Sequence, residues 1–217
     1  VCVRSITGGP TTAEIGMRGF GENSHGRVLV LLDGQKLNRP DMASINWMQI
    51  PLSNVERIEI VRGGQSALYG DHAVAGVINI ITRQGQGEPG GYVSAEAGSF
   101  GSLTVQAGAA GQEKDLSWTV NADRQNSDGY RDRTGFTSWG AGARLGYGMA
   151  PGSSVALALN YSDVDYEIPG WLNEMQLAED RKQSTSTDDS AHTRYFNSDV
   201  TMKLGLANAQ RLESGVS

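Results

Sequence analysis

In the first third of the chain, hydrophobic residues form short, nearly continuous runs between turn residues. The run VLVLL at Val28–Leu32 predicts a strand that is covered on both faces, because no position in it is polar. The pair Asp33-Gly34 that follows predicts a tight hairpin. Strands are expected at residues 28–32, 35–37, 55–61 and 77–81, and a short helix at residues 42–49, capped by Asp41 and ended before Pro51. Together these elements predict a small domain with a compact mixed sheet.

After the polar stretch at residues 83–90, the pattern changes to strict alternation of hydrophobic and polar residues. At residues 116–123 (LSWTVNAD) every even position is apolar and every odd position is polar, which indicates a strand with one apolar face. Long strands are expected at residues 92–98, 102–109, 116–123, 139–147, 155–161 and 195–206. About six strands of this length are typical of part of a transmembrane barrel, although a soluble sandwich also alternates.

The lengths of the predicted connections favour the barrel. Short turns at residues 110–114 and 150–153 alternate with long connections at residues 125–136 and 165–193. Outer-membrane barrels have short turns on one side of the membrane and long loops on the other. Aromatic residues near strand ends would also suit interfacial girdles, although each could lie in a core: Tyr92, Trp139, Tyr147 and Tyr161. A soluble β-rich binding or adhesive protein is the alternative.

Composition narrows the classes of function. The formal net charge is −6 and no basic cluster interrupts it, which argues against a nucleic-acid partner. No apolar run reaches about 18 residues, so no membrane-spanning helix is expected, whereas a spanning barrel is compatible with low hydropathy. The single Cys2 has no partner for a disulfide or a metal site. The chain starts at Val1 without a leader-like segment, so we expect a removed signal or a piece of a longer protein.

The segment GQSALYGDH at residues 64–72 invites comparison with catalytic and phosphate-binding loops. A nucleophile elbow at Ser66 requires a glycine two residues later, where Leu68 stands. A phosphate-binding loop requires a lysine where Asp71 stands. His72 beside Asp71 suggests a general base, but adjacent loop residues do not usually face each other and no nucleophile is identified. We therefore interpret the segment as a glycine-rich crossing between strands and expect no enzyme, with a hydrolase that uses Ser66 as a third hypothesis.

Five short motifs occur in a fixed order along residues 15–82. They are IGMRGF at 15–20, VLVLLDG at 28–34, IPL with VERIEIVRG at 50–63, SALYG at 66–70 and GVINIIT at 76–82. In this order they resemble the plug domain of TonB-dependent outer-membrane receptors, and the alternating half resembles the start of that family's barrel. The resemblance implies an α+β plug domain at residues 1–84, followed at residues 85–217 by the first strands of an antiparallel transmembrane β-barrel.

The resemblance also implies a function. Receptors of this family import scarce, bulky nutrients such as ferric siderophores, cobalamin or haem through a barrel of about 22 strands in the outer membrane. The protein TonB supplies the energy by binding a segment ahead of the plug, outer-membrane lipid surrounds the barrel, and no cofactor is implied. Because the TonB-binding segment and most of the barrel are missing, the sequence is expected to be an interior piece of such a receptor.

The resemblance assigns roles to individual residues. Arginines of two RG motifs face barrel glutamates and seat the plug; they correspond to Arg18 and Arg62, which alternatively pack within the plug sheet. Ligand contacts are expected in two plug loops, at Asn23, Ser24, His25, Asn38, Arg39, Asp41, Asn46 and Trp47. Asp163 and Asp165, at the top of the fifth predicted strand, could hold calcium with acidic residues of the long loop. Calcium needs about six or more oxygens and the spacing does not supply them, so an ordinary acidic external loop and no metal site are expected.

Overall fold

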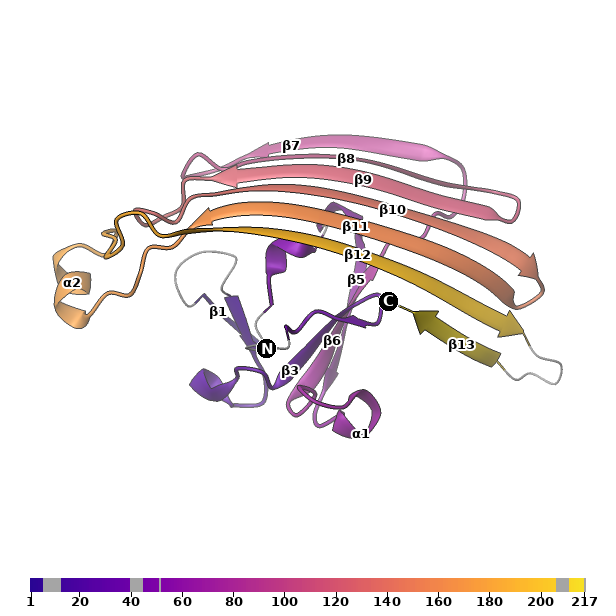
Figure 1. Ribbon diagram of the computed structural model, residues 1–217, viewed down its shortest axis with the longest axis horizontal. Coiled ribbons are helices and arrows are strands. Elements are labelled where there is room, and N and C mark those ends of the chain that lie inside the picture. The colour runs from indigo at the N-terminus through magenta and orange to yellow at the C-terminus, as the bar shows by residue number, and fades with distance from the viewer. Residues whose placement is uncertain (6–12, 40–44, 51, 206–210, 217) are drawn as a thin grey trace.

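The computed structural model describes residues 1–5, 13–39, 45–50, 52–205 and 211–216 (Figure 1). Its described strands form a two-stranded, a four-stranded and a seven-stranded sheet. The two-stranded sheet pairs β1 (Cys2–Ser5) with β2 (Ala13–Gly16) in antiparallel register. Neither of these two strands was predicted, because each has only four residues and no clear alternation.

The four-stranded sheet has the order β4 (Gln35–Lys36), β3 (Val28–Leu32), β6 (Gly76–Thr82) and β5 (Val55–Arg62). Strands β3 and β6 are parallel, and the outer pairs are antiparallel. Every residue of β3 is buried, with Val28, Val30 and Leu32 in one apolar cluster and Leu29 and Leu31 in another. The predicted covering of this strand on both faces is confirmed.

The segment between β4 and β5 differs from the prediction of one helix at residues 42–49. It contains two single-turn 3-10 helices, η3 (Trp47–Gln49) and η4 (Leu52–Asn54). Asn46 has an extended backbone, and its side-chain oxygen accepts a hydrogen bond from Met48 N at 3.0 Å, so the helical turn begins after it. The predicted cap Asp41 lies outside the described residues.

The long sheet contains all six predicted long strands and a seventh. In order they are β7 (Gly90–Ala97), β8 (Leu103–Glu113), β9 (Leu116–Ser127), β10 (Phe136–Ala150), β11 (Ser153–Glu167), β12 (Ser190–Gly205) and β13 (Arg211–Val216). Neighbours in the chain are antiparallel neighbours in the sheet. Turns at residues 114–115 and 151–152 are short, whereas connections at 128–135 and 168–189 are long, as predicted, and the longer one contains α2 (Glu174–Glu179).

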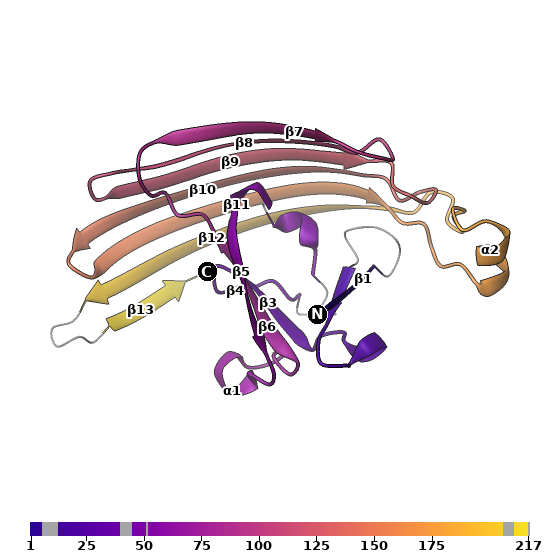
Figure 2. The same cartoon turned by 180° about the vertical axis from the view of Figure 1, so that it is seen from behind.

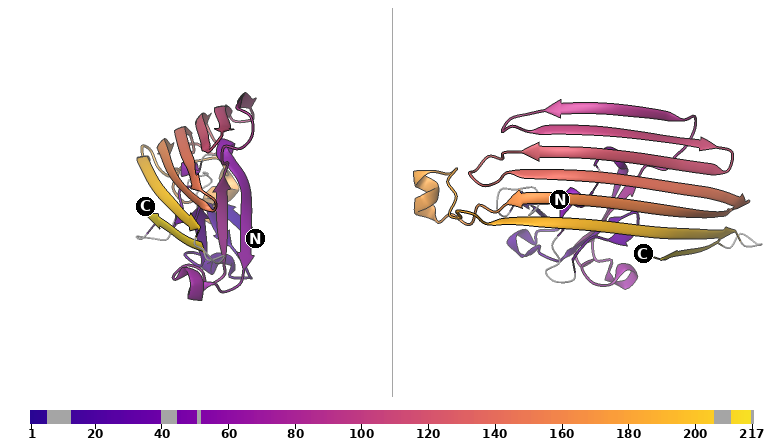
Figure 3. Two further views of the ribbon diagram at one scale, coloured as in Figure 1. Left: turned by 90° about the vertical axis from the view of Figure 1, so that its right-hand side faces the viewer. Right: turned by 45° about the horizontal axis from the view of Figure 1, so that its top comes forward.

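The seven-stranded sheet arches over the two smaller sheets, and α2 projects from one of its ends (Figure 1). Seen from behind, the smaller sheets lie under the concave face, and α1 (Ser66–Tyr69) lies on their far side (Figure 2). The edge-on and tilted views in Figure 3 show the long strands as one open, curved layer. Among the described residues, no helix is long and apolar enough to cross a membrane.

The two faces of the long sheet differ in polarity. Exposed apolar side chains on the convex face include Trp139, Leu145, Tyr147, Tyr161, Phe196 and Val200. On the concave face Thr119, Asn121, Asp123, Ser138 and Ser162 are buried. Tyr92 departs from the expected aromatic girdle, because it pairs with Gly108, which pairs with the concave-facing Asn121, and cross-strand neighbours share a face.

Candidate functional site

The two arginines predicted to seat the plug lie close together. Arg18 follows β2 with a positive φ of 56°, and Arg62 ends β5. Arg18 Nη1 lies 3.9 Å from the point where a Cβ on Gly63 would stand, so it reaches the residue next to Arg62. Both side chains are exposed, and within the described part of the chain neither forms an ion pair. Their pairing with barrel glutamates stays a prediction.

The first predicted ligand loop follows β2 and contains η2 (Gly21–Asn23). Asn23 and His25 are exposed, whereas Ser24 is buried against Gly16. His25 Nδ1 lies 2.7 Å from Glu14 Oε1, and this anchors the ring to β2. The loop therefore offers Asn23 and His25 to solvent and uses Ser24 for packing.

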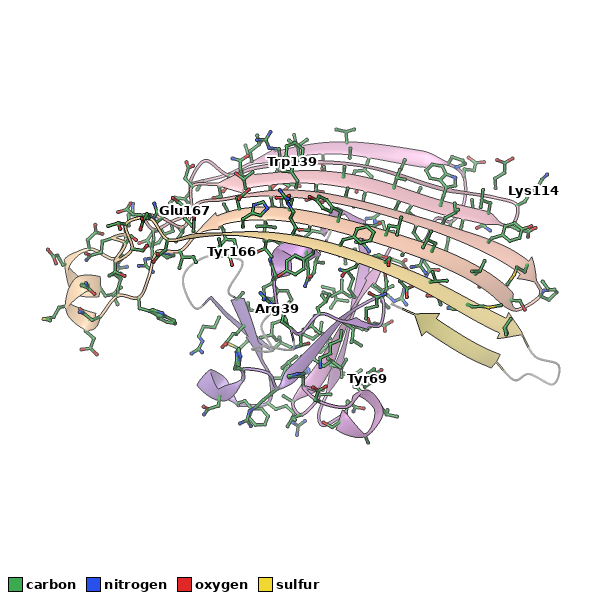
Figure 4. The ribbon with its side chains drawn as sticks, in the orientation of Figure 1. Arg39, Tyr69, Lys114, Trp139, Tyr166 and Glu167 are labelled. Carbon is green, nitrogen blue, oxygen red and sulfur yellow. The ribbon has the colours of Figure 1, made fainter. Side chains whose placement is uncertain are left out.

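The second predicted ligand loop follows β4. Asn38 is buried and acts as an extension of the sheet, because its amide accepts from Val30 N at 2.8 Å and donates to Val28 O at 3.0 Å. Asn46 caps η3, and Trp47 donates from Nε1 to Ala13 O at 2.6 Å. Arg39, labelled in Figure 4, is exposed. Asn38 and Trp47 thus have partners in the small sheets, and Asn46 has its partner in η3.

The glycine-rich segment at residues 64–72 corrects one expectation. Asp71 and His72 do face each other, with His72 Nε2 3.2 Å from Asp71 Oδ2. The positive φ of 64° at His72 turns its ring back, and its Nδ1 lies 2.8 Å from Gly26 O. Asp71 also accepts from Lys36 Nζ at 2.8 Å, and this hydrogen bond lowers the pKa of the carboxyl group. Within the described residues Ser66 makes no hydrogen bond with His72, so the pair joins the loop to β4 rather than activating the serine.

The small sheets touch the concave face of the long sheet through polar groups that the sequence did not reveal. Arg144 Nη1 on β10 lies 3.9 Å from Asp33 Oδ2, and about a fifth of each side chain is exposed. Ser162 Oγ on β11 donates to Met48 O of η3 at 3.2 Å. The sequence predicts a hairpin turn at Asp33 and an alternating strand around Arg144. It does not predict that these two distant segments lie in contact.

A signal for Arg144 exists in the strand itself. The concave-facing positions of β10 include Ser138, Gly140, Gly142, Arg144, Gly146 and Gly148. A Cβ at Gly140 would stand 2.5 Å from Asp123 Oδ1, and one at Gly142 would stand 2.6 Å from Asn121 Oδ1. The glycines make room for polar side chains of the adjacent strand. Arg144 is the one charged residue in this row, which indicates that its side chain interacts with another segment of the protein.

On the concave face of the long sheet, several polar atoms are buried without a hydrogen-bond partner in the described part of the protein. Among the described residues these include Thr119 Oγ1, both amide atoms of Asn121, and Ser138 Oγ, all on the concave face. Buried polar atoms are normally hydrogen-bonded to protein or to ordered water. The interface between the small sheets and the long sheet is therefore suited to water-mediated contacts.

Comparisons with known proteins agree with this architecture. The family model of the TonB-dependent Receptor Plug Domain matches residues 2–77. A vitamin B12 transporter of Vibrio cholerae serotype O1 is 39% identical over 137 residues, which cover 57% of this chain and 22% of that protein. An iron-regulated outer membrane virulence protein of the same species is 36% identical over 124 residues, covering 54% of this chain and 18% of the relative. This chain thus spans about a fifth of the length of these curated relatives.

Solved structures share the fold. A ferric citrate transporter in its unliganded form superposes with a TM-score of 0.78 at 19% identity, covering 98% of this chain and 35% of that chain. The ferripyoverdine receptor of the outer membrane of Pseudomonas aeruginosa gives a TM-score of 0.75 at 15% identity, covering 97% of this chain and 29% of that chain. The small sheets and the long sheet therefore have the arrangement of a plug and its barrel wall.

Proposed function

We propose that this chain is part of a transport protein. The premise is that it belongs to the TonB-dependent receptors of the outer membrane. In this proposal residues 1–84 are the plug and residues 85–217 the N-terminal part of the barrel wall. The receptor takes up a scarce, bulky nutrient, which is a ferric siderophore, cobalamin or haem, and TonB supplies the energy. Cobalamin and ferric complexes are the first ligands to test, because similar proteins are named for vitamin B12 and ferric citrate.

One observation carries the proposal: the plug meets the wall through polar groups. Both buried apolar clusters of the described residues consist of residues 15–80 alone, so the plug has a core of its own. Among the described residues, the polar contacts to the wall include Arg144 with Asp33 and Ser162 with Met48 O. Such contacts are directional and individually modest. A plug held in this way can move without exposing its apolar core.

The predicted site residues take two roles in the proposal. Asn23, His25 and Arg39 contact the ligand, since their side chains are exposed. Ser24, Asn38, Asn46 and Trp47 shape the two loops through packing and hydrogen bonds, and Asp41 is kept as a contact candidate outside the described residues. Arg18 and Arg62 face glutamates of the barrel wall and help to seat the plug.

Two other functions are less well supported. A soluble binding or adhesive protein would cover the apolar residues of the long strands with a second layer, whereas here Trp139, Leu145 and Val200 are exposed on the convex face. A hydrolase would need an activated Ser66, and α1 holds that residue on an exposed single turn. We therefore propose a receptor that is not an enzyme.

Uptake in whole cells tests this function. The full-length receptor is expressed in a Gram-negative host that lacks its own cobalamin and siderophore receptors, with TonB either present or deleted. We expect surface binding of one ligand class in both strains and uptake only in the strain with TonB. Uptake that is equal in both strains, or no binding of any of the three ligand classes at normal surface abundance, would overturn the proposal.

A further inference from the structure

A row of polar side chains crosses the convex face of the long sheet. Strand register places Arg124, Trp139, Asp163 and Arg194 side by side on β9, β10, β11 and β12. The next row toward the α2 end contains Thr137, Asp165 and His192. The rows on the other side are mainly apolar: Ala122, Ala141, Tyr161 and Phe196, then Val120, Ala143 and Leu159, then Trp118, Leu145, Leu157 and Val200. The polar row therefore marks one border of an apolar band.

The carboxylates in this border hold Arg194 and His192 in place. Asp163 Oδ2 accepts from Arg194 Nε at 2.7 Å and from Tyr161 OH at 2.9 Å. His192 Nδ1 lies 2.6 Å from Asp165 Oδ1, and its Nε2 lies 3.5 Å from Asp163 Oδ1. Asp163 and Asp165 had been expected in an external loop, but they lie within β11. Their outward orientation explains why they contact β12 rather than the plug.

Two guanidinium groups keep hydrogen-bond donors available. Arg124 stacks over the Trp139 ring with its Cζ 4.7 Å from the ring centroid, which fixes the plane of the guanidinium but uses none of its N–H groups. Arg194 uses only Nε for Asp163, and within the described residues its Nη atoms make no hydrogen bond. A planar guanidinium with free N–H groups matches the geometry of a phosphate.

A cleft of about 660 Å³ opens beside these residues. Its lining includes Arg124, Asn126, Thr137, Asp165 and His192, so it joins the polar border to the α2 end of the sheet. Trp139 lies in the half of the sheet nearer α2, and Lys114 lies at the opposite end (Figure 4). Charged residues on the lipid face of a barrel are costly at the middle of the bilayer and much less so near its surface. The border thus falls where lipid headgroups begin.

We propose that this border, formed by Arg124, Asp163, Asp165, His192 and Arg194, binds the phosphate-bearing headgroup of a lipid whose acyl chains cover the apolar band. This inference rests on the proposed location of the long sheet in the outer membrane. Arg124 and Arg194 contact the phosphate, and Asp163 and Asp165 hold Arg194 and His192 in position. The occupant is a lipid rather than a soluble anion, because the cationic groups adjoin a continuous apolar surface that acyl chains can cover.

Native mass spectrometry of the purified full-length receptor tests this site. The receptor in detergent is titrated with phosphatidylglycerol, and the lipid molecules that stay bound are counted for wild type, for Arg124→Gln/Arg194→Gln, and for Lys114→Gln. The last variant removes one positive charge at the opposite end of the sheet. We expect the double variant to bind the lipid at least about tenfold more weakly, because each charged hydrogen bond contributes about this factor. The control should match wild type.

Three outcomes would overturn the proposal. Equal lipid binding by the double variant and wild type would remove the arginines from the site. Displacement of the lipid by millimolar inorganic phosphate would identify a soluble-phosphate site instead. Binding of magnesium alone, lost in Asp165→Asn, without any lipid binding, would identify a cation site. Heat-dependent gel mobility verifies that each barrel is folded, and the measurement needs neither TonB nor nutrient, so its failure is distinct from failure of the transport proposal.

Discussion

Asp33 links the interior of the plug to the wall. Its positive φ of 51° turns the chain from β3 into β4, and its carboxylate accepts from Thr82 N at 2.8 Å and from Thr82 Oγ1 at 2.5 Å. The same carboxylate lies 3.9 Å from Arg144 Nη1. The bonds to Thr82 stabilise the plug sheet, whereas the pair with Arg144 stabilises only the seating of the plug. The two contributions can therefore be separated by mutation.

Replacing Arg144 with Met should loosen the plug without unfolding it. The variant loses the ion pair but keeps the bonds between Asp33 and Thr82, so seating should weaken by about 1 kcal/mol, the upper range for a partly exposed pair. Asp33→Ala should cost about 1–3 kcal/mol more within the plug, because Thr82 N is left without its acceptor. The measurement is the urea concentration at which protease cuts the plug of the full-length receptor. An Arg144→Met midpoint identical to that of wild type would refute the assigned contact.

At the scale of the elements, the long strands separate a lipid face from a plug face. Cross-strand pairs share a face, so the exposed Val200 of β12 lies in the apolar band with Leu157, whereas Thr201 lies on the concave face with Ala156.

Hydrogen bonds join the two long connections at the α2 end of the sheet. Arg131 donates from Nη1 to Gly170 O at 3.2 Å and from Nη2 to Gln183 O at 3.0 Å, which joins the connection after β9 to the one after β11.

The arginine variants of two adjacent residues should differ in assembly. Val200→Arg places a charge in the middle of the apolar band, which costs about 2–4 kcal/mol on the lipid side of a barrel. Thr201→Arg places it on the concave face, where Thr201 is only partly buried and water can hydrate the charge. We expect far less folded Val200→Arg receptor in the outer membrane, measured by heat-dependent gel mobility. Equal amounts of the two variants would contradict the assigned faces.

The sequence predicted the centres of the long strands better than their ends. Strand β12 begins at Ser190, but alternation became visible only from Tyr195, because the outward residues His192 and Arg194 are polar. Helix α2 was not predicted, although the sequence contains its capping box, formed by Asn173 and Gln176. Alternation predicts which face of a strand is apolar, but it is lost where the outward-facing residues are polar as well.

The predicted ligand loops show a different limit. Asn38 and Asn46 are predicted as ligand contacts because they lie in plug loops and their side chains can hydrogen-bond to a polar ligand, yet one completes the edge of β3 and the other caps η3. Whether an asparagine side chain faces solvent or bonds to the backbone depends on where the chain turns, and the composition of a loop does not predict this. Asp33 and Arg144 are 111 positions apart in the numbering, and only the packing of the plug on the wall brings them together.

For the molecule as a whole, the central feature is a plug with its own core, which lies on the polar concave face of a sheet whose convex face is apolar. The plug has its own buried core, and among the described residues its polar contacts to the wall include Arg144 with Asp33 and Ser162 with Met48 O. Contacts of this kind are individually modest. We therefore expect the plug to move relative to β10 and β11 when the proposed receptor imports its nutrient.

A reversible cross-link between plug and wall tests this expectation most directly. Ser162 Oγ lies 3.2 Å from the backbone O of Met48, so Met48→Cys/Ser162→Cys places two cysteines on adjoining residues of plug and wall, in a Cys2→Ser background because Cys2 is exposed and free. We predict that the oxidised full-length receptor binds its nutrient at the cell surface but does not import it, that a reductant restores uptake, and that each single cysteine variant transports normally. Normal uptake by a receptor that is fully cross-linked, as shown by its resistance to thiol labelling, would contradict the account.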